Sequence, residues 1–341
     1  MPRNDIDWEK LGFGFSDVNC HIRAVWKDGE WGEFELVKDP FITMHIGASC
    51  LHYGQECFEG IKAFRQKDGR IAIFRPMQNA KRMERTAIRC VMPPMPPEKF
   101  VEACDRVIAA NEEFVPPYGT GGSLYIRPLL IGTGPQSGVA PAKEYTFMIM
   151  VMPVGAYYKG GMKPVRAVIL DDWDRAAPHG MGDVKVGGNY AASLFAHEKA
   201  KHDGWPVELY LDAKSHQFVE EFSTSNFMGI TKDGRYVTPD SCSVLPSVTN
   251  LSLRDVARDL GMTVERRPIP YTEIRDFAAV AALGTAVVIT PVWEITRGSD
   301  VIRISDPDVV HPTLTKLYQT VQGIQYGEIP DTHGWCPEVS I

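Results

Sequence analysis

The sequence predicts an α+β protein that is divided into two domains. Its 341 residues, of which 44% are hydrophobic and 23% charged, can bury more than one core, and a chain of this length usually forms about two domains. Strand and helix signals alternate along it. The least regular stretch, residues 153–164, is rich in glycine and begins and ends with proline, which is typical of a linker. We expect a smaller N-terminal domain at 1–153, an interdomain loop at 154–164 and a larger C-terminal domain at 165–341.

The N-terminal half contains one clear hairpin signal and one clear helix signal. Residues 66–70 read Gln-Lys-Asp-Gly-Arg and are followed by the apolar run 71–74, a pattern typical of a turn between two strands. Pro97 then begins a helix, because the hydrophobic residues after it recur at helical spacing. These residues are Phe100, Val101, Cys104, Val107 and Ile108.

The C-terminal half repeats these signals. A second hairpin signal, Lys-Asp-Gly-Arg, occupies residues 232–235. Residues 245–250 precede a helical pattern that stops at Gly261, which makes Thr249 the expected N-cap of that helix. A last helical pattern consists of Leu314, Leu317, Tyr318, Val321 and Ile324.

Composition argues against several classes of function. A net charge of -7 does not suit binding to a phosphate backbone, so no nucleic-acid partner is expected. No apolar stretch approaches the roughly 20 residues of a membrane helix, and the N-terminus does not resemble a signal peptide, so we expect a cytoplasmic protein without a membrane partner. The seven cysteines are scattered without a CxxC pair, which predicts reduced packing residues and no metal site.

Lys185 is the first candidate for chemistry. It lies between Val184 and Val186 at the start of a glycine turn. A desolvated lysine amine can form a Schiff base with a carbonyl, whereas a protonated surface lysine cannot. For a single lysine, the end of an ordinary strand is the commoner interpretation. The chemical hypothesis therefore depends on what the rest of the chain supplies.

Pyridoxal phosphate, the common aldehyde cofactor, needs a carboxylate at its pyridine nitrogen, a phenolate donor and a phosphate site. Glu220 and Glu221 follow each other on a predicted strand, so we expect them to point to opposite faces and only one to enter a site. The helix start near Thr249 and the small-residue break at 284–286 offer backbone amides for an anion. Each signal is also compatible with an ordinary cap or turn.

Taken together, the segments resemble the branched-chain amino acid aminotransferases, which are class IV, or fold type IV, pyridoxal phosphate enzymes. The resemblance is collinear and covers nearly the whole chain. It is carried by residues 13–14, 51–60, 74–76, 125–128, 182–190, 221–227, 245–249, 284–286 and 324–327. It implies a fold like that of D-amino acid aminotransferase, with a smaller N-terminal α/β domain and a larger C-terminal pseudo-barrel domain.

The resemblance also implies a role for each cofactor residue. Lys185 matches the Schiff-base lysine, Glu221 the partner of the pyridine nitrogen and Tyr190 the donor to the phenolate. Arg82 matches the phosphate arginine, and Arg175, ten residues before Lys185, matches a second arginine near the phosphate in longer members. The remaining phosphate contacts are expected from Val248, Thr249 and Thr285.

The implied reaction is the reversible transfer of the amino group of L-leucine, L-isoleucine or L-valine to 2-oxoglutarate, which yields the branched-chain 2-oxo acid and L-glutamate. The aromatic wall for the aliphatic side chain is expected from Tyr53, Phe58, Tyr125 and Tyr157. Arg127 matches the residue that meets the side-chain carboxylate of glutamate, and the amides of Thr285 and Ala286 would receive the α-carboxylate. Val139 lies in the loop that family members send across a dimer interface, so a homodimer is expected.

Two departures from the family pattern stand out. Ser247 and Asn250 replace a common glycine and arginine in the phosphate turn, and residues 287–290 lack the CxxC switch of mammalian members, which predicts no thiol regulation of that kind. Enzymes of the same fold remain alternatives: a D-amino acid aminotransferase, an R-selective amine aminotransferase or an aminodeoxychorismate lyase. A cofactor-binding protein without turnover, or a scaffold, is the alternative from a different class.

Overall fold

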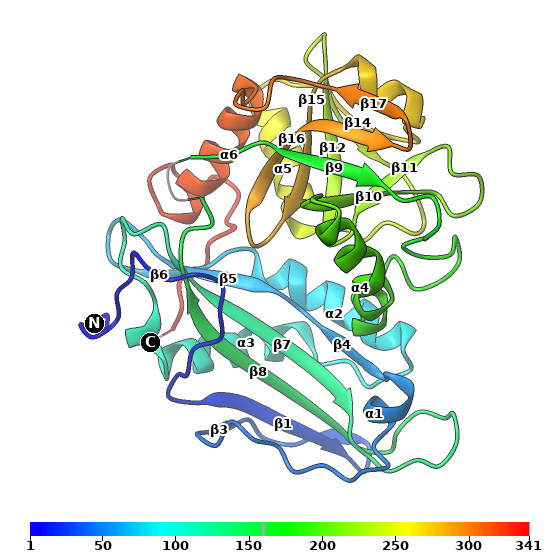
Figure 1. The fold of residues 1–341 in the computed structure, drawn as a ribbon. Coiled ribbons are helices and arrows are strands. Elements are labelled where there is room, and N and C mark those ends of the chain that lie inside the picture. Colours follow the sequence, from blue (N-terminus) through cyan, green and yellow to red (C-terminus); the bar gives the residue numbers. More distant parts are fainter. Residues whose placement is uncertain (159–160, 341) are drawn as a thin grey trace. The chain divides into compact units, whose positions relative to one another are not determined.

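A computed structural model describes residues 1–158 and 161–340. The chain forms two compact units (Figure 1). The first unit comprises residues 1–157, 184–187 and 323–341, and the second comprises 158–183 and 188–322. The expected domain ranges therefore differ from these units at 184–187 and 323–341, which the first unit includes. Lys159 and Gly160 of the expected interdomain loop lie outside the described residues.

The first unit is built on an antiparallel sheet. Its strands run in the order β2-β1-β8-β7-β5-β6, with β3 paired to β1 and β4 paired to β7. Their bounds are β1 His21–Lys27, β2 Glu30–Trp31, β3 Glu35–Val37, β4 Glu56–Phe58, β5 Ile61–Arg65, β6 Ile71–Ile73, β7 Ser123–Gly132 and β8 Tyr145–Val154. The hairpin expected at 66–74 is confirmed as β5 and β6, which are joined by a turn with Gly69 at φ +91°.

Helices pack on one face of this sheet. They are α1 Ser49–Tyr53, α2 Pro76–Arg89, α3 Pro97–Ala109 and the short 3₁₀ helix η1 Glu112–Phe114. The helix predicted after Pro97 is confirmed as α3, and its periodic residues Phe100, Cys104, Val107 and Ile108 are fully buried. The Phe100 ring lies 6.0 Å from the ring of Phe147 on β8, which anchors α3 to the sheet.

The second unit contains a sheet that closes on itself. Its order is β11-β10-β9-β16-β15-β12-β13-β14, and because β11 also pairs with β12, the strands from β11 to β12 form a closed ring. The bounds are β9 Val165–Ile169, β10 Val207–Leu211, β11 Val219–Phe222, β12 Ser225–Thr231, β13 Tyr236–Pro239, β14 Val264–Arg267, β15 Phe277–Gly284, β16 Val288–Arg297 and β17 Asp300–Arg303. This closure confirms the expected pseudo-barrel.

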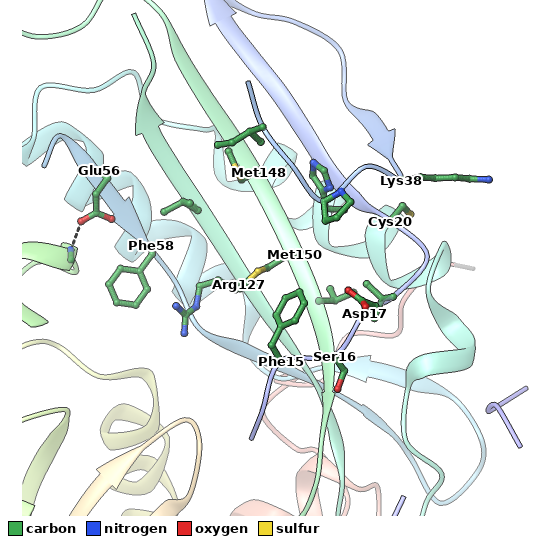
Figure 2. A pocket seen from close by; sticks show the side chains of 17 residues that line it. Phe15, Ser16, Asp17, Cys20, Lys38, Glu56, Phe58, Arg127, Met148 and Met150 are labelled. Atoms are coloured by element: carbon green, nitrogen blue, oxygen red, sulfur yellow. Dashed lines mark hydrogen bonds between the residues drawn. The ribbon is translucent and has the colours of Figure 1, made fainter. Parts of the chain in front are cut away.

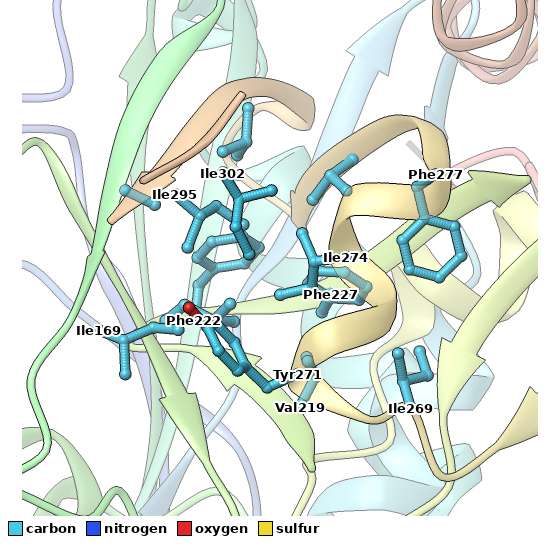
Figure 3. Close-up of a cluster of buried hydrophobic side chains, with 14 of the residues drawn as sticks. Ile169, Val219, Phe222, Phe227, Ile269, Tyr271, Ile274, Phe277, Ile295 and Ile302 are labelled. Carbon is cyan, nitrogen blue, oxygen red and sulfur yellow. The ribbon is translucent and has the colours of Figure 1, made fainter. Parts of the chain in front are cut away.

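The core of the second unit is aromatic and aliphatic (Figure 3). The rings of Phe222 and Phe227 stack with their centroids 5.9 Å apart, and Phe277 packs against Phe227 at 6.2 Å. The 3₁₀ helix η2, Tyr271–Asp276, adds Tyr271 and Ile274 to the same cluster. The hairpin expected at 232–235 is confirmed as the turn between β12 and β13, with Gly234 at φ +85°.

The longer helices of the C-terminal half are α4 Gly187–His202, α5 Val248–Asp259 and α6 Pro312–Gln325. The N-cap of α5 corrects our expectation. Ser247, not Thr249, is the N-cap, because its hydroxyl accepts from the backbone N–H of Asn250 at 3.2 Å, and Thr249 lies inside the first turn of the helix. The serine that departs from the family pattern thus performs an ordinary capping role. The pattern at 314–324 is confirmed by α6, where Leu314, Leu317, Val321 and Ile324 are buried.

Candidate active site

Lys185 belongs to a short segment that is bonded to the first unit by its backbone. The N–H of Phe58 donates to the carbonyl of Lys185 at 3.2 Å, and the N–H of Lys185 donates to the hydroxyl of Thr86 at 3.2 Å. The N–H of Gly187 donates to the carboxylate of Glu56. Because the backbone is held on both sides of residue 185, the position of the side chain is set by the first unit.

The neighbours of Lys185 decide where its amine lies. Val184 and Val186 are 2% and 7% exposed, so the two valines noted in the sequence are packing residues. The Lys185 side chain reaches the ring of Phe58, and its Nζ lies 4.5 Å from the ring centroid. An amine above an aromatic ring is partly removed from water, which is the environment that a lysine nucleophile needs.

Arg82, the expected phosphate arginine, is one half of a buried ion pair. Its Nε and Nη2 donate to the two carboxylate oxygens of Glu59, each at 2.7 Å, and Asn79 adds a third bond at 2.8 Å. Burial raises the pKa of the Glu59 carboxyl, but Arg82, Lys185 and Asn79 outweigh it, so the pKa lies below its usual value. In the sequence, Glu59 was only part of a matching string and had no assigned role.

Arg127 lies between two aromatic rings of the first unit. Its guanidinium carbon is 4.9 Å from the ring centroid of Phe58 and 5.2 Å from that of Tyr125, and Nη2 donates to the Tyr125 hydroxyl at 2.8 Å. Its Nε is buried without a hydrogen-bond partner in the described part of the chain. Gly60 permits this arrangement, because a Cβ at that position would lie 2.5 Å from the Tyr125 oxygen.

Phe58 and Arg127 line a cavity of about 690 Å³ in the first unit (Figure 2). Glu56 and Gly187 lie on its wall beside the Lys185 segment, and Met148 and Met150 of β8 add flexible apolar surface. A wall of this kind suits an apolar ligand with a few fixed polar contacts. Of the expected substrate residues, Phe58 and Arg127 line this cavity.

The remaining expected substrate residues of the first unit, which are Tyr53, Tyr125, Val139 and Tyr157, do not line this cavity, and three of them are exposed. Val139 is 86% exposed, Tyr157 is 59% exposed and Tyr53 is 44% exposed. The Tyr53 hydroxyl donates to the carbonyl of Ser137 at 3.3 Å, so Tyr53 contacts the same loop as Val139. These side chains are placed on the surface of the first unit.

Glu221, the expected pyridine partner, lies in the second unit and is 2% exposed. One carboxylate oxygen accepts from the N–H of Leu245 and forms an ion pair with Arg175, both at 2.9 Å, and the other accepts from the amide of Asn226 at 2.7 Å. Burial raises the pKa of Glu221 to about 7, although Arg175 and these donors oppose the shift. A carboxylate has about four acceptor positions, so Oε2 retains capacity for a pyridine N–H.

The expected alternation of Glu220 and Glu221 is wrong. Glu220 accepts from the hydroxyls of Ser241 and Ser243, and Glu221 accepts from Leu245 of the same loop. The cause is a β-bulge: Leu209 pairs with Phe222, whereas Leu211 pairs with Val219, so β11 has one extra residue. A bulge of this kind breaks the alternation of faces, and both carboxylates reach one loop.

The other expected cofactor residues of the second unit lie at element ends. Val248 and Thr249 begin α5, with Thr249 8% exposed, and Tyr190 is in the first turn of α4. Thr285 and Ala286 lie in the tight connection between β15 and β16. Such helix starts and turns present backbone amides to an anion.

Asn250 was noted in the sequence only as a departure from the family. Its side chain accepts from the hydroxyl of Tyr236 at 2.8 Å and donates to Asn226 at 3.2 Å and to Thr238 at 2.9 Å. Asn226 in turn bonds Glu221. The first turn of α5 is therefore connected to Glu221 through two asparagines, a link that no local sequence signal marks.

The comparisons with known proteins agree with this fold. The family model "Amino-transferase class IV" matches residues 56–295. The chain is 46% identical to the branched-chain-amino-acid aminotransferase of Haemophilus influenzae, over 98% of this chain and 99% of that protein. This chain belongs to the class IV aminotransferase family.

Two solved structures of similar proteins extend this result. A branched-chain amino acid aminotransferase from Escherichia coli has a TM-score of 0.78 at 27% identity, covering 93% of this chain and 99% of that one. The T.th. branched-chain amino acid aminotransferase in complex with N-(5'-phosphopyridoxyl)-L-glutamate has a TM-score of 0.76 at 26% identity, covering 97% and 99%. The protein is a pyridoxal phosphate-dependent aminotransferase with the type IV fold.

No helix within 1–158 and 161–340 is long and apolar enough to cross a membrane. In the same ranges, no three histidine, cysteine, aspartate or glutamate side chains are grouped as a metal ion would require.

Proposed function

We propose that this enzyme reversibly transfers the amino group of L-leucine, L-isoleucine or L-valine to 2-oxoglutarate, giving the branched-chain 2-oxo acid and L-glutamate. The observation that carries this proposal is Arg127, a half-buried cation between the rings of Phe58 and Tyr125 at the wall of a largely apolar cavity. Aliphatic side chains gain from burial against such walls, and the guanidinium can bind a carboxylate. The named activity of the Haemophilus influenzae relative and the glutamate adduct of the T.th. enzyme support both halves of the reaction.

Pyridoxal phosphate supplies an aldehyde that binds amines covalently and a pyridinium ring that withdraws electrons. We assign Lys185 as the residue that holds it through a Schiff base. The donor set in the second unit fits the cofactor: Glu221 has an open acceptor position for the ring nitrogen, and α5 starts with backbone amides at Val248 and Thr249. Tyr190 would donate to the phenolate.

Lys185 has a second task in this proposal. Once released from the cofactor, its Nζ would take the proton from the substrate α-carbon as a general base and would give it to the C4′ carbon of the cofactor as a general acid. Phe58 lies under the amine, with Nζ 4.5 Å from the ring centroid, and limits its access to water. The backbone bonds around residue 185 keep the amine within a short range of positions.

The remaining residues have binding roles. Arg82, with Thr285, would complete the phosphate contacts, and the amides of Thr285 and Ala286 would bind the substrate α-carboxylate. Arg127 would discriminate for glutamate through its side-chain carboxylate.

We further propose that the active form is a homodimer. Large apolar side chains are exposed on the first unit, including Phe41 at 80%, Ile46 at 83%, Leu51 at 60% and Val139 at 86%. Exposed apolar groups of this size are typical of interfaces. A second copy would cover them and give Tyr53, Val139 and Tyr157 a setting near substrate. Light scattering of the wild type and of a Val139→Asp variant would test this assembly, and a monomeric, fully active wild type would contradict it.

The decisive assay is a panel of L- and D-amino acids with 2-oxoglutarate as acceptor, scored for glutamate. We expect L-leucine, L-isoleucine and L-valine to be the best donors. Preference for D-amino acids or R-amines would support the alternative aminotransferases, and release of pyruvate from aminodeoxychorismate would support the lyase. A cytoplasmic location stays a prediction, which fractionation of the source cells would test.

A further inference from the structure

We propose that Arg175 is a positioning residue for Glu221, which it keeps charged and directed at the pyridine nitrogen, and that it does not bind the cofactor phosphate. This inference rests on the proposed role of Glu221. It replaces the phosphate role that the resemblance to longer family members implied for Arg175.

The guanidinium of Arg175 joins three separate segments of the second unit. Nη2 lies 2.9 Å from Oε1 of Glu221 and donates to the carbonyl of Gly182 at 3.2 Å. Nη1 donates to the carbonyl of Ser243 at 2.8 Å. The strand that carries Glu221, the loop before Lys185 and the loop before α5 are thus connected by one side chain.

This geometry leaves little of the arginine for a phosphate. Both terminal nitrogens are occupied by the protein: Nη1 and Nη2 each donate to a carbonyl, and Nη2 also forms the ion pair with Glu221. The side chain is 6% exposed, and its contacts are all with the protein's own carboxylate and carbonyl oxygens. The phosphate contacts can instead come from the amides at the start of α5.

The close packing of the two loops indicates that the contact is built into the fold. A Cβ at Gly182 would lie 2.1 Å from the carbonyl oxygen of Ser243, so only glycine allows this approach. Ser243 and Ser241 also bond Glu220. The loop that receives Arg175 is therefore fixed from both of its sides.

Charge balance explains why Glu221 needs this partner. The carboxylate is buried, and Glu220 adds a second negative group that disfavours its ionisation. Arg175 is the largest influence that favours the charged form, ahead of Leu245 and Asn226. Loss of the cation would shift Glu221 further toward the neutral carboxyl, which is less able to keep a proton on the pyridine nitrogen.

The test uses the full chain, stripped of cofactor and titrated with three ligands. These are pyridoxal phosphate, pyridoxal without the phosphate, and the 1-deaza analogue of pyridoxal phosphate, in which carbon replaces the ring nitrogen. The variants are Arg175→Gln and Arg175→Lys, with Arg82→Gln as the matched control for the loss of a buried arginine. Dissociation constants and the absorbance of the lysine-bound cofactor are measured.

We expect Arg175→Gln to weaken binding of pyridoxal phosphate by about tenfold or more, the size expected when a charged hydrogen-bonded group is lost. Its affinity for the 1-deaza analogue should stay close to that of the wild type, and its preference for pyridoxal phosphate over pyridoxal should be retained. Arg175→Lys should recover part of the loss. Arg82→Gln should show the converse pattern and lose the preference for the phosphate.

Two results would overturn the inference. If Arg175→Gln loses the preference for pyridoxal phosphate over pyridoxal, the arginine binds the phosphate. If it weakens all three ligands equally, its role is only structural. Failure of the proposed function would look different, because the wild type would then show no lysine-bound absorbance or no glutamate formation from branched-chain amino acids.

Discussion

The two units each bury one arginine against one glutamate, and the two pairs behave in opposite ways. Arg82 and Glu59 share two bonds of 2.7 Å, and Asn79 adds a third to the carboxylate, so the pKa of Glu59 falls. Arg175 gives Glu221 one contact of 2.9 Å and directs its other bonds to carbonyls, so burial prevails and the pKa rises to about 7. In the first pair, both carboxylate oxygens of the glutamate are bonded by protein side chains. In the second pair, Glu221 keeps an acceptor position and has a pKa near neutral pH, which suits a residue that must bind a ligand.

The largest expected effect is that of removing Lys185, which carries the proposed chemistry and also helps to lower the pKa of Glu59 in the first pair. Lys185→Ala should lower turnover by on the order of 10⁴-fold or more, as the loss of a covalent catalytic group does. Cofactor should still bind through its phosphate, but the absorbance of the lysine-bound form should be absent.

The matched control is Lys199→Ala, which removes an exposed lysine paired with Asp203 and should leave turnover unchanged. Persistence of the lysine-bound absorbance in Lys185→Ala would falsify the assignment.

The next prediction compares how much stability is lost when each of the two glutamates is replaced. Glu59→Gln should lower the free energy of unfolding by about 3–5 kcal/mol, because it leaves the buried Arg82 without its counter-charge. Glu221→Gln should cost less stability, since burial already disfavours the charged form of this carboxyl, but it should reduce turnover more. Urea unfolding and turnover of both variants measure the contrast. Equal stability losses would show that the two pairs are energetically alike.

The two pairs should also differ in the pH dependence of the cofactor-free protein. Glu221 has a folded pKa of about 7, above its unfolded value, so the folded state holds the proton more tightly. The free energy of unfolding should therefore decrease between about pH 4.5 and 7, by roughly 3 kcal/mol from this group, and be flat above pH 7. Glu59, whose pKa is lowered, should act in the opposite direction, stabilising the fold above its unfolded pKa and losing that contribution as the pH falls below it.

Unfolding of wild type and Glu221→Gln across this range gives the measurement. The slope between about pH 4.5 and 7 should become smaller in the variant, and an unchanged slope would refute the raised pKa of Glu221.

The smallest expected effect is that of replacing Arg127, which packs between two aromatic rings. In the described residues Arg127 contacts Phe58 and Tyr125 and makes no ion pair. Arg127→Ala should reduce kcat/KM for glutamate and 2-oxoglutarate by about ten- to a hundredfold, the size of a lost charged hydrogen bond, and reduce that for leucine less. Arg23→Ala, which removes an exposed arginine paired with Glu35, is the control. Equal losses for both substrates would indicate a structural arginine.

Local features of the fold could be predicted from the sequence. The two hairpins were recognised from an Asp-Gly turn, and α3 was recognised from the spacing of its apolar residues. Each of these signals is contained within a short stretch of sequence. The ring closure of the barrel depends on the pairing of β11 with both β10 and β12, which no local pattern encodes. It was expected only because the chain resembles a known family.

The site was predicted less evenly. Lys185 was found from its string, whereas Glu59 was missed because its partner Arg82 lies 23 residues away. The alternation rule failed at Glu220 and Glu221, because a bulge is set by the pairing of strands and not by the strand itself. The role of Asn250 was not recognised, because it depends on a contact with Asn226 in β12, which is distant in the sequence.

The closed ring has one further consequence for the second unit. A strand at an open edge can slide along its single neighbour, but β11 is bonded on both sides, by β10 and by β12. A slip of one residue would exchange the places of Glu220 and Glu221, and it would have to break both ladders together. The closure of the barrel therefore determines which of the two adjacent glutamates is available for chemistry.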